Sequence, residues 1–98
     1  MDPVAVDAYV LDVLMRDLVA HDRQPSAFLV YLYIWRRAAQ VTRGAVALSH
    51  QMIADGTGLS KSAVQAALRT LVRRKLVRAE KKSRTATPLY TLHHHWRR

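Results

Sequence analysis

The stretch that decides the fold of this chain is IADGTGLSKSAVQAAL, which runs from Ile53 to Leu68. It has the pattern of two short helices separated by only a few residues. Gly58 stands where a helix end needs a positive φ, which glycine adopts without strain from a Cβ atom. Leu59 can make the hydrophobic contact that often seals such an end, and Ser60 can cap the next helix, contributing about 1 kcal/mol relative to alanine. Three consecutive residues therefore predict a tight joint that fixes the angle between two helices.

The helices on either side of this joint follow from capping and periodicity. Ser49 is a suitable N-cap for a first helix that carries Met52, Ile53 and Ala54. Gly56 costs this helix about 1 kcal/mol relative to alanine, so either the helix ends early or close backbone packing requires the glycine. The second helix has an apolar face that we expect to pack against the first. The residues of that face are Val64, Ala67, Leu68 and Leu71.

Downstream of the second helix the apolar pattern changes to period two. Val77 and Ala79 alternate with Arg78 and Glu80, and residues 88–92 form another strand candidate beyond a polar tip. Two such strands around a basic tip predict a β-hairpin. A further short strand is predicted at residues 45–48, upstream of the joint.

Two more helices are predicted in the first forty residues. Asp2 and Pro3 indicate the start of the first helix, with the aspartate as N-cap and the proline in the first helical position. Asp12 and Arg16 are spaced as an i,i+4 ion pair on its surface. Ser26 can cap the helix that follows. The apolar residues that recur at helical spacing in the first helix are Val6, Tyr9, Val10, Val13, Leu14 and Leu18.

An unbroken apolar stretch extends from Ala27 to Trp35. Its length and aromatic content also fit a strand, but residues 36–40 extend it with good helix formers and favour a helix over about 27–40. A helix that is apolar all round must be covered all round. We therefore expect the first helix, or a second copy of the protein, to cover the side that the rest of the domain leaves open.

At residues 48–77 the chain, LSHQMIADGTGLSKSAVQAALRTLVRRKLV, resembles the winged helix-turn-helix domain of bacterial and phage DNA-binding proteins. Similar domains occur in transcriptional regulators and in plasmid or phage replication initiators. The resemblance covers about residues 27–92 and implies a mainly α fold with a small β-hairpin wing, preceded by an extra N-terminal helix. We expect one domain over residues 1–98, made of an N-terminal helix (1–24), a winged-helix core (25–92) and a basic tail (93–98).

The resemblance implies that the helix from Lys61 to about Lys75 is the recognition helix, which lies in the major groove of double-stranded DNA. Lys61, Gln65 and Arg69 are spaced i, i+4, i+8 and so share a face. Lysine and arginine can donate to guanine O6 and N7, and glutamine can pair bidentately with adenine. The residues expected at base edges are Ser60, Lys61, Ser62, Gln65, Ala66 and Arg69.

Other contacts are expected with the DNA backbone and from the wing. Many members of the family carry an arginine at the position of Ala66, and its absence removes a common contact, although alanine can still touch a thymine methyl group. The residues expected at phosphates are Ser49, Thr57 and Arg73. The residues of the wing are Lys81, Lys82 and Arg84.

Composition and charge agree with a nucleic-acid partner. The net charge is +9, and residues 41–98 carry twelve lysines and arginines against only Asp55 and Glu80. Such an asymmetry predicts that the C-terminal part binds a dense polyanion. The chain has no cysteine, no basic segment before an apolar run at its start and no apolar run long enough to span a bilayer, which predicts a cytoplasmic location.

Enzyme and metal functions find little support in the sequence. The three glycines form no phosphate-binding loop, no serine lies in a nucleophile elbow, and the aspartates step around a helix instead of converging. On a strand, His93 and His95 would point to one side, but a closed metal site needs more ligands than these. We therefore predict no cofactor and no metal, and a tail from residue 93 that is flexible or faces nucleic acid.

The function predicted from the sequence is sequence-specific binding of double-stranded DNA by a transcriptional regulator. A homodimer through the first two helices is expected, because residues 27–35 present more apolar surface than one small domain covers. One alternative is a replication or plasmid-maintenance factor with the same fold, and another is a module whose basic face binds an acidic protein. The remaining cations fit either an ordinary solvated face or phosphate contacts; they are Arg73, Arg74, Lys75 and Arg78.

Overall fold

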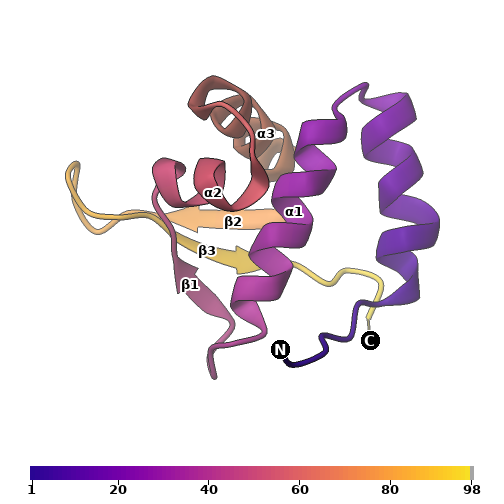
Figure 1. Ribbon diagram of the computed structural model, residues 1–98, viewed down its shortest axis with the longest axis horizontal. Coiled ribbons are helices and arrows are strands. Elements are labelled where there is room, and N and C mark those ends of the chain that lie inside the picture. The colour runs from indigo at the N-terminus through magenta and orange to yellow at the C-terminus, as the bar shows by residue number, and fades with distance from the viewer. Residues whose placement is uncertain (98) are drawn as a thin grey trace.

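The computed structural model describes residues 1–97 and combines four helices with a three-stranded antiparallel sheet (Figure 1). An N-terminal helix, residues 8–21, packs against the rest of the domain and contains two π-helical segments, η1 (Val10–Leu14) and η2 (Asp17–His21). The other elements are α1 (Pro25–Ala38), β1 (Ala45–Ala47), α2 (His50–Thr57), α3 (Lys61–Arg73), β2 (Val77–Glu80) and β3 (Leu89–Leu92). The fold is the predicted winged helix-turn-helix with an extra N-terminal helix.

The joint between α2 and α3 has the predicted local structure. Gly58 has φ +80° and ψ +7°, and its N–H donates to the carbonyl of Ala54 at 2.9 Å, which closes α2. Leu59 is partly buried and packs against the core. The backbone N–H of Ala63 donates to Ser60 Oγ at 3.1 Å, which caps α3. Because each residue satisfies a different backbone or packing requirement, the angle between the helices is determined within a few positions of the chain.

Gly56 lies inside α2 because of its packing against α1. The helix continues past it to Thr57, so the glycine does not mark an early end. A Cβ atom at this position would overlap the ring of Tyr33. Close packing of α2 against α1 therefore explains the glycine at position 56. This confirms the second of the two interpretations that the sequence allowed, and excludes an early end of the helix.

The sheet contains the predicted hairpin and one additional pairing. Strand β3 pairs antiparallel with β2, and Ala79 lies opposite Tyr90. Strand β1 pairs with the other edge of β3, so that the order is β1-β3-β2. The buried Tyr90 on the central strand lies opposite Val46 on one side and Ala79 on the other. The sheet thereby packs against two helices, with β3 in contact with α1 and β2 in contact with α3.

The apolar stretch 27–35 is helical, which excludes the strand alternative. Helix α1 begins one residue earlier than the expected cap: Gln24 is the N-cap, and Pro25 occupies the first turn, where it has no N–H to satisfy. Ser26 is therefore not the cap. The buried side chains of α1 are Ala27, Phe28, Val30, Tyr31, Ile34 and Trp35.

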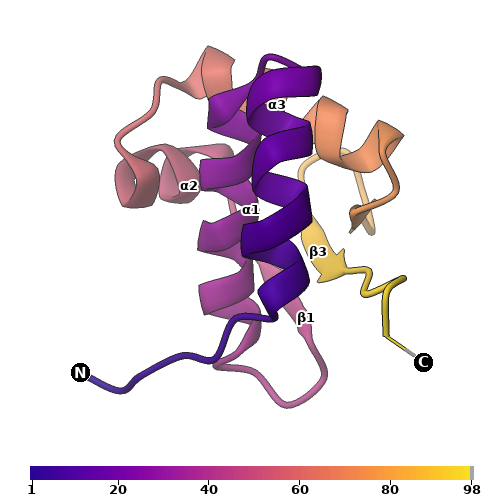
Figure 2. The same ribbon diagram turned by 90° about the vertical axis from the view of Figure 1, so that its right-hand side faces the viewer.

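The N-terminal helix covers the side of α1 that the rest of the domain leaves open (Figure 2). Its buried residues Val10, Leu14 and Leu18 are spaced by four and belong to the same hydrophobic core as α1. The apolar excess of residues 27–35 is thus mostly absorbed within one copy, and only Leu29 in this stretch is exposed. A dimer was expected because residues 27–35 present more apolar surface than one small domain covers. This reason does not hold, because the N-terminal helix of the same chain covers α1.

The N-terminal helix differs from its prediction in two ways. It begins at residue 8, because the carbonyl of Ala5 accepts a hydrogen bond from Trp35 Nε1 at 2.8 Å and Asp7 is held by the C-terminal segment. Asp2 and Pro3 are therefore not a helix start. The N–H groups of Met15 and Asp22 bond to carbonyls five residues back, which is the π-helical pattern.

The predicted ion pair between Asp12 and Arg16 is wrong for the described residues, where neither side chain takes part in a salt bridge. The i,i+4 rule for such pairs assumes the α-helical repeat. Both residues lie in or beside a π-helical turn, where the wider winding changes the relation between successive turns.

Candidate nucleic-acid interface

Helix α3 separates its buried face from a polar face that is open to solvent. Its core side is formed by Val64, Ala67, Leu68, Thr70 and Leu71. Five of the residues expected at base edges are exposed: Ser60 at the N-cap and, on the side opposite the core, Lys61, Ser62, Gln65 and Arg69. Ala66 lies between the two faces and is partly buried. Lys61, Gln65 and Arg69, which the sequence predicted to share a face, are therefore all exposed on the surface of α3.

The capping serines keep a donor available. Ser49 Oγ accepts from the N–H of Met52 at 3.1 Å, and Ser60 Oγ accepts from the N–H of Ala63 at the same distance. Each hydroxyl uses a lone pair in its cap, so its hydrogen remains free to be donated. The hydroxyls of Ser60 and Ser62 are 3.2 Å apart and can share one hydrogen.

Thr57 has a different role from these serines. Its Oγ1 donates to the carbonyl of Ile53 at 2.7 Å and accepts from the N–H of Leu59 at 3.3 Å. The single hydroxyl hydrogen is therefore used inside the joint, where it ties the end of α2 to the turn. In this conformation Thr57 cannot also donate to a phosphate through its side chain.

His50 belongs to the same face, although sequence analysis did not single it out. It begins α2, and its Nδ1 lies 3.5 Å from Gln65 Nε2 on α3. The only sequence signal was its position after the Ser49 cap, and the proximity to Gln65 depends on the angle of the joint. An open hollow of about 520 Å³ continues from this pair between α3 and β2. Its lining includes Leu68, Arg69, Val72, Arg73, Ala79 and Tyr90.

The loop between β2 and β3 extends away from the body of the molecule and forms the wing (Figure 1). Lys81, Lys82 and Arg84 are all exposed in this loop. Lys81 Nζ donates to the backbone carbonyl of Arg84 at 3.4 Å, which bridges the tip. The structure thus places the three predicted wing cations together on one projecting loop.

The ion pairs divide the cations into two groups. Arg74 lies 3.7 Å from Asp17 and 3.3 Å from Asp22, and therefore joins the end of α3 to the N-terminal helix. Arg78 is 2.7 Å from Glu80. These two arginines therefore act within the fold. In contrast, six exposed cations of α3 and the wing form no salt bridge within residues 1–97; they are Lys61, Arg69, Arg73, Lys81, Lys82 and Arg84.

The C-terminal segment packs against the N-terminal one, so the flexible tail, one of the two predicted alternatives, is wrong, whereas a tail that faces nucleic acid stays a prediction. Trp96 stacks on Tyr9 with ring centroids 4.6 Å apart, and its Nε1 donates to Asp7 Oδ2 at 2.8 Å. Arg97 donates to both oxygens of Asp7 at 2.7 and 2.8 Å. These contacts hold residues 94–97 on the body; the last residue of the predicted tail, Arg98, lies outside the described residues.

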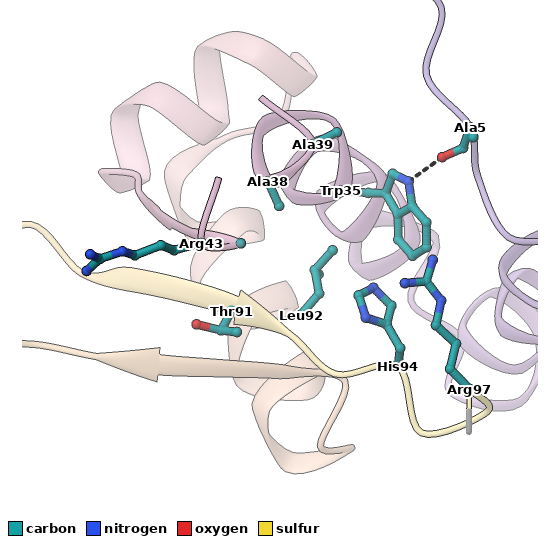
Figure 3. A pocket seen from close by; sticks show the side chains of 10 residues that line it. Ala5, Trp35, Ala38, Ala39, Arg43, Thr91, Leu92, His94 and Arg97 are labelled. Carbon is teal, nitrogen blue, oxygen red and sulfur yellow. Dashed lines mark hydrogen bonds between the residues drawn. The ribbon is translucent and has the colours of Figure 1, made fainter. Parts of the chain in front are cut away.

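Figure 3 shows how this cluster ends a cleft of about 400 Å³. The imidazole of His94 and the guanidinium of Arg97 converge on Trp35, whereas the side chain of Arg43 points away from them. Hydrogen bonds from Arg97 and Trp96 lower the pKa of Asp7 to about 2. Burial, and then the charge of Arg97, lower the pKa of His94. The cleft is built from α1, the loop between α1 and β1, β3 and the two terminal segments, not from α3 or the wing.

Within the described part of the chain, no three side chains of the metal-binding types come together as a candidate site. Nor does any helix there combine the length and the apolar content that crossing a membrane requires.

Comparison with known proteins finds a match to a family model. None of the curated proteins matches the chain. A family model described as a helix-turn-helix domain matches residues 24–77, which is more than half of the chain and includes α1, α2, the joint and α3. With a capped joint of the required geometry and this match, the chain belongs to the helix-turn-helix domain family.

Proposed function

We propose that this protein binds specific sequences in double-stranded DNA and acts as a transcriptional regulator. The observation that carries the proposal is the face of α3 formed by Lys61, Gln65 and Arg69, which is exposed and whose cations have no ion-pair partner among residues 1–97. A surface that leaves its cations unpaired, while the fold pairs other arginines, suits a ligand that supplies the negative charge.

In this proposal some side chains of α3 contact base edges and others contact phosphates. Arg69 and Lys61 can donate to guanine, and Gln65 can pair bidentately with adenine. Ala66, at the edge of the same face, can touch a thymine methyl group. The free hydroxyl hydrogens of Ser49 and Ser60 and the guanidinium of Arg73 suit phosphate oxygens, which position the helix without reading sequence. The function is binding without catalysis, in the cytoplasmic location expected from the sequence.

The wing adds a second, less specific contact. Lys81, Lys82 and Arg84 project from the body on one loop and match the charge of the DNA backbone. Specificity would then come from α3, and a large share of the affinity from the wing. We further propose a homodimer joined through the N-terminal helices, which would favour a palindromic site with half-sites about one helical turn apart.

The test is selection of bound duplexes from a random pool, followed by mapping of the enriched motif on genomic DNA. The proposal expects a short enriched motif and sites upstream of genes. Sites confined to a replication origin would favour the alternative of a replication or maintenance initiator. Equal binding of every duplex would contradict sequence-specific recognition, and absence of binding would leave the protein-interaction module as the better reading.

A further inference from the structure

The N-terminal helix carries a row of apolar side chains that nothing in the described structure covers. Leu11, Met15 and Val19 are 46%, 40% and 39% exposed and are spaced by four along the helix. This spacing is the same as that of the buried row that packs on α1, so the exposed residues also form one continuous row. Single exposed apolar residues are ordinary, whereas an aligned row on an outer helix is typical of a binding surface.

Two charges of opposite sign flank this row and are unpaired within the described chain. Asp12 and Arg16 each follow a member of the row by one position, and both are exposed. The π-helical winding leaves them without the mutual ion pair that their spacing would favour in an α-helix. The row therefore has an acid and a base beside it, each available to a partner.

From this arrangement we infer an antiparallel pair of N-terminal helices, one from each of two copies, related by a twofold axis close to Met15. Such an axis places Leu11 of each copy beside Val19 of the other, with the two Met15 side chains at the centre. The same rotation brings Asp12 of each copy within about one helical turn of Arg16 of the other. The inference deepens the proposed homodimer by naming its interface and its ion pairs.

A second copy is the occupant that the charges favour. A twofold interface must be self-complementary, so an acid on one copy needs a base opposite it on the other copy, and the same sequence must supply both. Asp12 and Arg16 flank Met15 along the chain. A twofold axis near Met15 therefore places the aspartate of each copy near the arginine of the other, which gives two ion pairs. An unrelated partner would need no such symmetry. The paired helices would lie on the far side of α1 from α3, which leaves both recognition helices free (Figures 1 and 2).

The first experiment measures the mass of the full chain by analytical ultracentrifugation for the wild type, Met15→Glu and Met52→Glu. Met52 is a matched control, because it is 48% exposed but lies on α2. We expect a dimer for the wild type and Met52→Glu and a monomer for Met15→Glu, where two carboxylates would meet at the axis. A monomeric wild type, or dissociation by Met52→Glu instead of Met15→Glu, would overturn the inference.

The second experiment exchanges the charges and tests the direction of packing. Asp12→Arg alone and Arg16→Asp alone should each weaken the homodimer by on the order of tenfold, because like charges then face each other. An equimolar mixture of the two variants should recover dimerisation, since each partner again presents the complementary charge. The double variant should recover it as well. Single exchanges without effect, or a mixture that stays monomeric, would contradict the antiparallel arrangement.

Binding of DNA separates this inference from the proposed function. Circular dichroism first establishes that Met15→Glu is folded, and a gel shift then uses a duplex with one half-site. Binding of the half-site by the monomeric variant, with loss of the advantage of a palindrome, supports both proposals. A wild type that is monomeric in the first experiment but binds the duplexes overturns the dimer alone. A wild type that dimerises but binds no duplex overturns the proposed function alone.

Discussion

Gln65 and Arg69 lie one turn apart on α3, but their neighbours restrain them to different degrees. Gln65 Nε2 lies 3.5 Å from the ring of His50, which biases the orientation of the amide. Arg69 has no hydrogen-bond or ion-pair partner among the described side chains, and its long side chain keeps its rotamer freedom. Ordering a free arginine on binding costs conformational entropy, whereas a partly oriented glutamine loses less. We therefore expect Gln65 to contribute more net affinity per hydrogen bond than Arg69.

Gln65→Ala and Arg69→Ala are each expected to lower affinity for the selected motif by about 1–3 kcal/mol at one position and to relax specificity there. The reason is the loss of a bidentate contact to one base edge. Fluorescence anisotropy with single-base variants of the motif measures the effect. Arg43→Ala, which removes an exposed cation outside this face, serves as the control for charge. A uniform loss over all duplexes would indicate phosphate contacts instead.

At the scale of elements, the wing and α3 are expected to differ in their response to salt. Lys82→Ala and Arg84→Ala should weaken binding to all sequences and should lower the slope of log K against log salt by about 0.9 for each lost phosphate contact. Arg78→Ala is a matched control at the base of the same hairpin, because its guanidinium is already paired with Glu80. The measurement is a salt titration of binding to specific and random duplexes. An unchanged slope in the wing variants would remove the wing from the interface.

The contact between α1 and α2 predicts a stability effect opposite to helix propensity. Propensity alone makes Gly56→Ala favourable by about 1 kcal/mol. Because the new methyl group would overlap the ring of Tyr33, we expect overpacking to dominate and to lower the free energy of unfolding by about 1–3 kcal/mol. Urea denaturation measures the change. In a Tyr33→Leu background the same substitution should cost much less, and a stabilised single variant would contradict the assigned contact.

At the scale of the whole molecule, the cluster around Asp7 joins segments ninety residues apart in sequence. The pKa of Asp7 is lowered to about 2 by its bonds to Arg97 and Trp96, so this carboxylate favours the folded state above its ordinary pKa and loses that contribution as pH falls toward 2. The pKa of His94 is also lowered, first by burial. Below the ordinary histidine pKa, near 6.5, the unfolded chain therefore binds the proton more readily, and stability falls.

Replacement of His94 should therefore change how stability depends on pH. The wild type is expected to lose stability as pH decreases from 7 to 5, and His94→Phe should flatten this decline, because it removes the group that titrates. Thermal unfolding monitored at several pH values checks the slope. His93→Phe, at the exposed neighbouring residue, should change the slope less than His94→Phe, because the charge of His93 is the smallest of the causes that act on the pKa of His94. If stability declined equally with pH in the wild type and in His94→Phe, His94 would not be the group that determines the pH dependence between 7 and 5.

The features that were predictable from the sequence are those that depend on neighbours a few positions away. The positive φ of Gly58, the caps at Ser49 and Ser60 and the buried face of α3 are all of this kind. The candidate site was largely predictable for the same reason, since residues spaced by four on a helix share a face whatever packs behind it. Its proposed contacts with DNA remain predictions.

Properties that join distant segments were decided only by the tertiary structure. The sequence by itself determined a capped joint, an amphipathic cationic helix and a basic hairpin, because backbone geometry and periodicity act locally. Only packing decided that β1 joins β3, that Arg74 is used to hold the N-terminal helix, and that the predicted free tail is anchored on Asp7. Each of these depends on which long-range contacts offset the entropy of closing the intervening chain, and no local pattern contains that information.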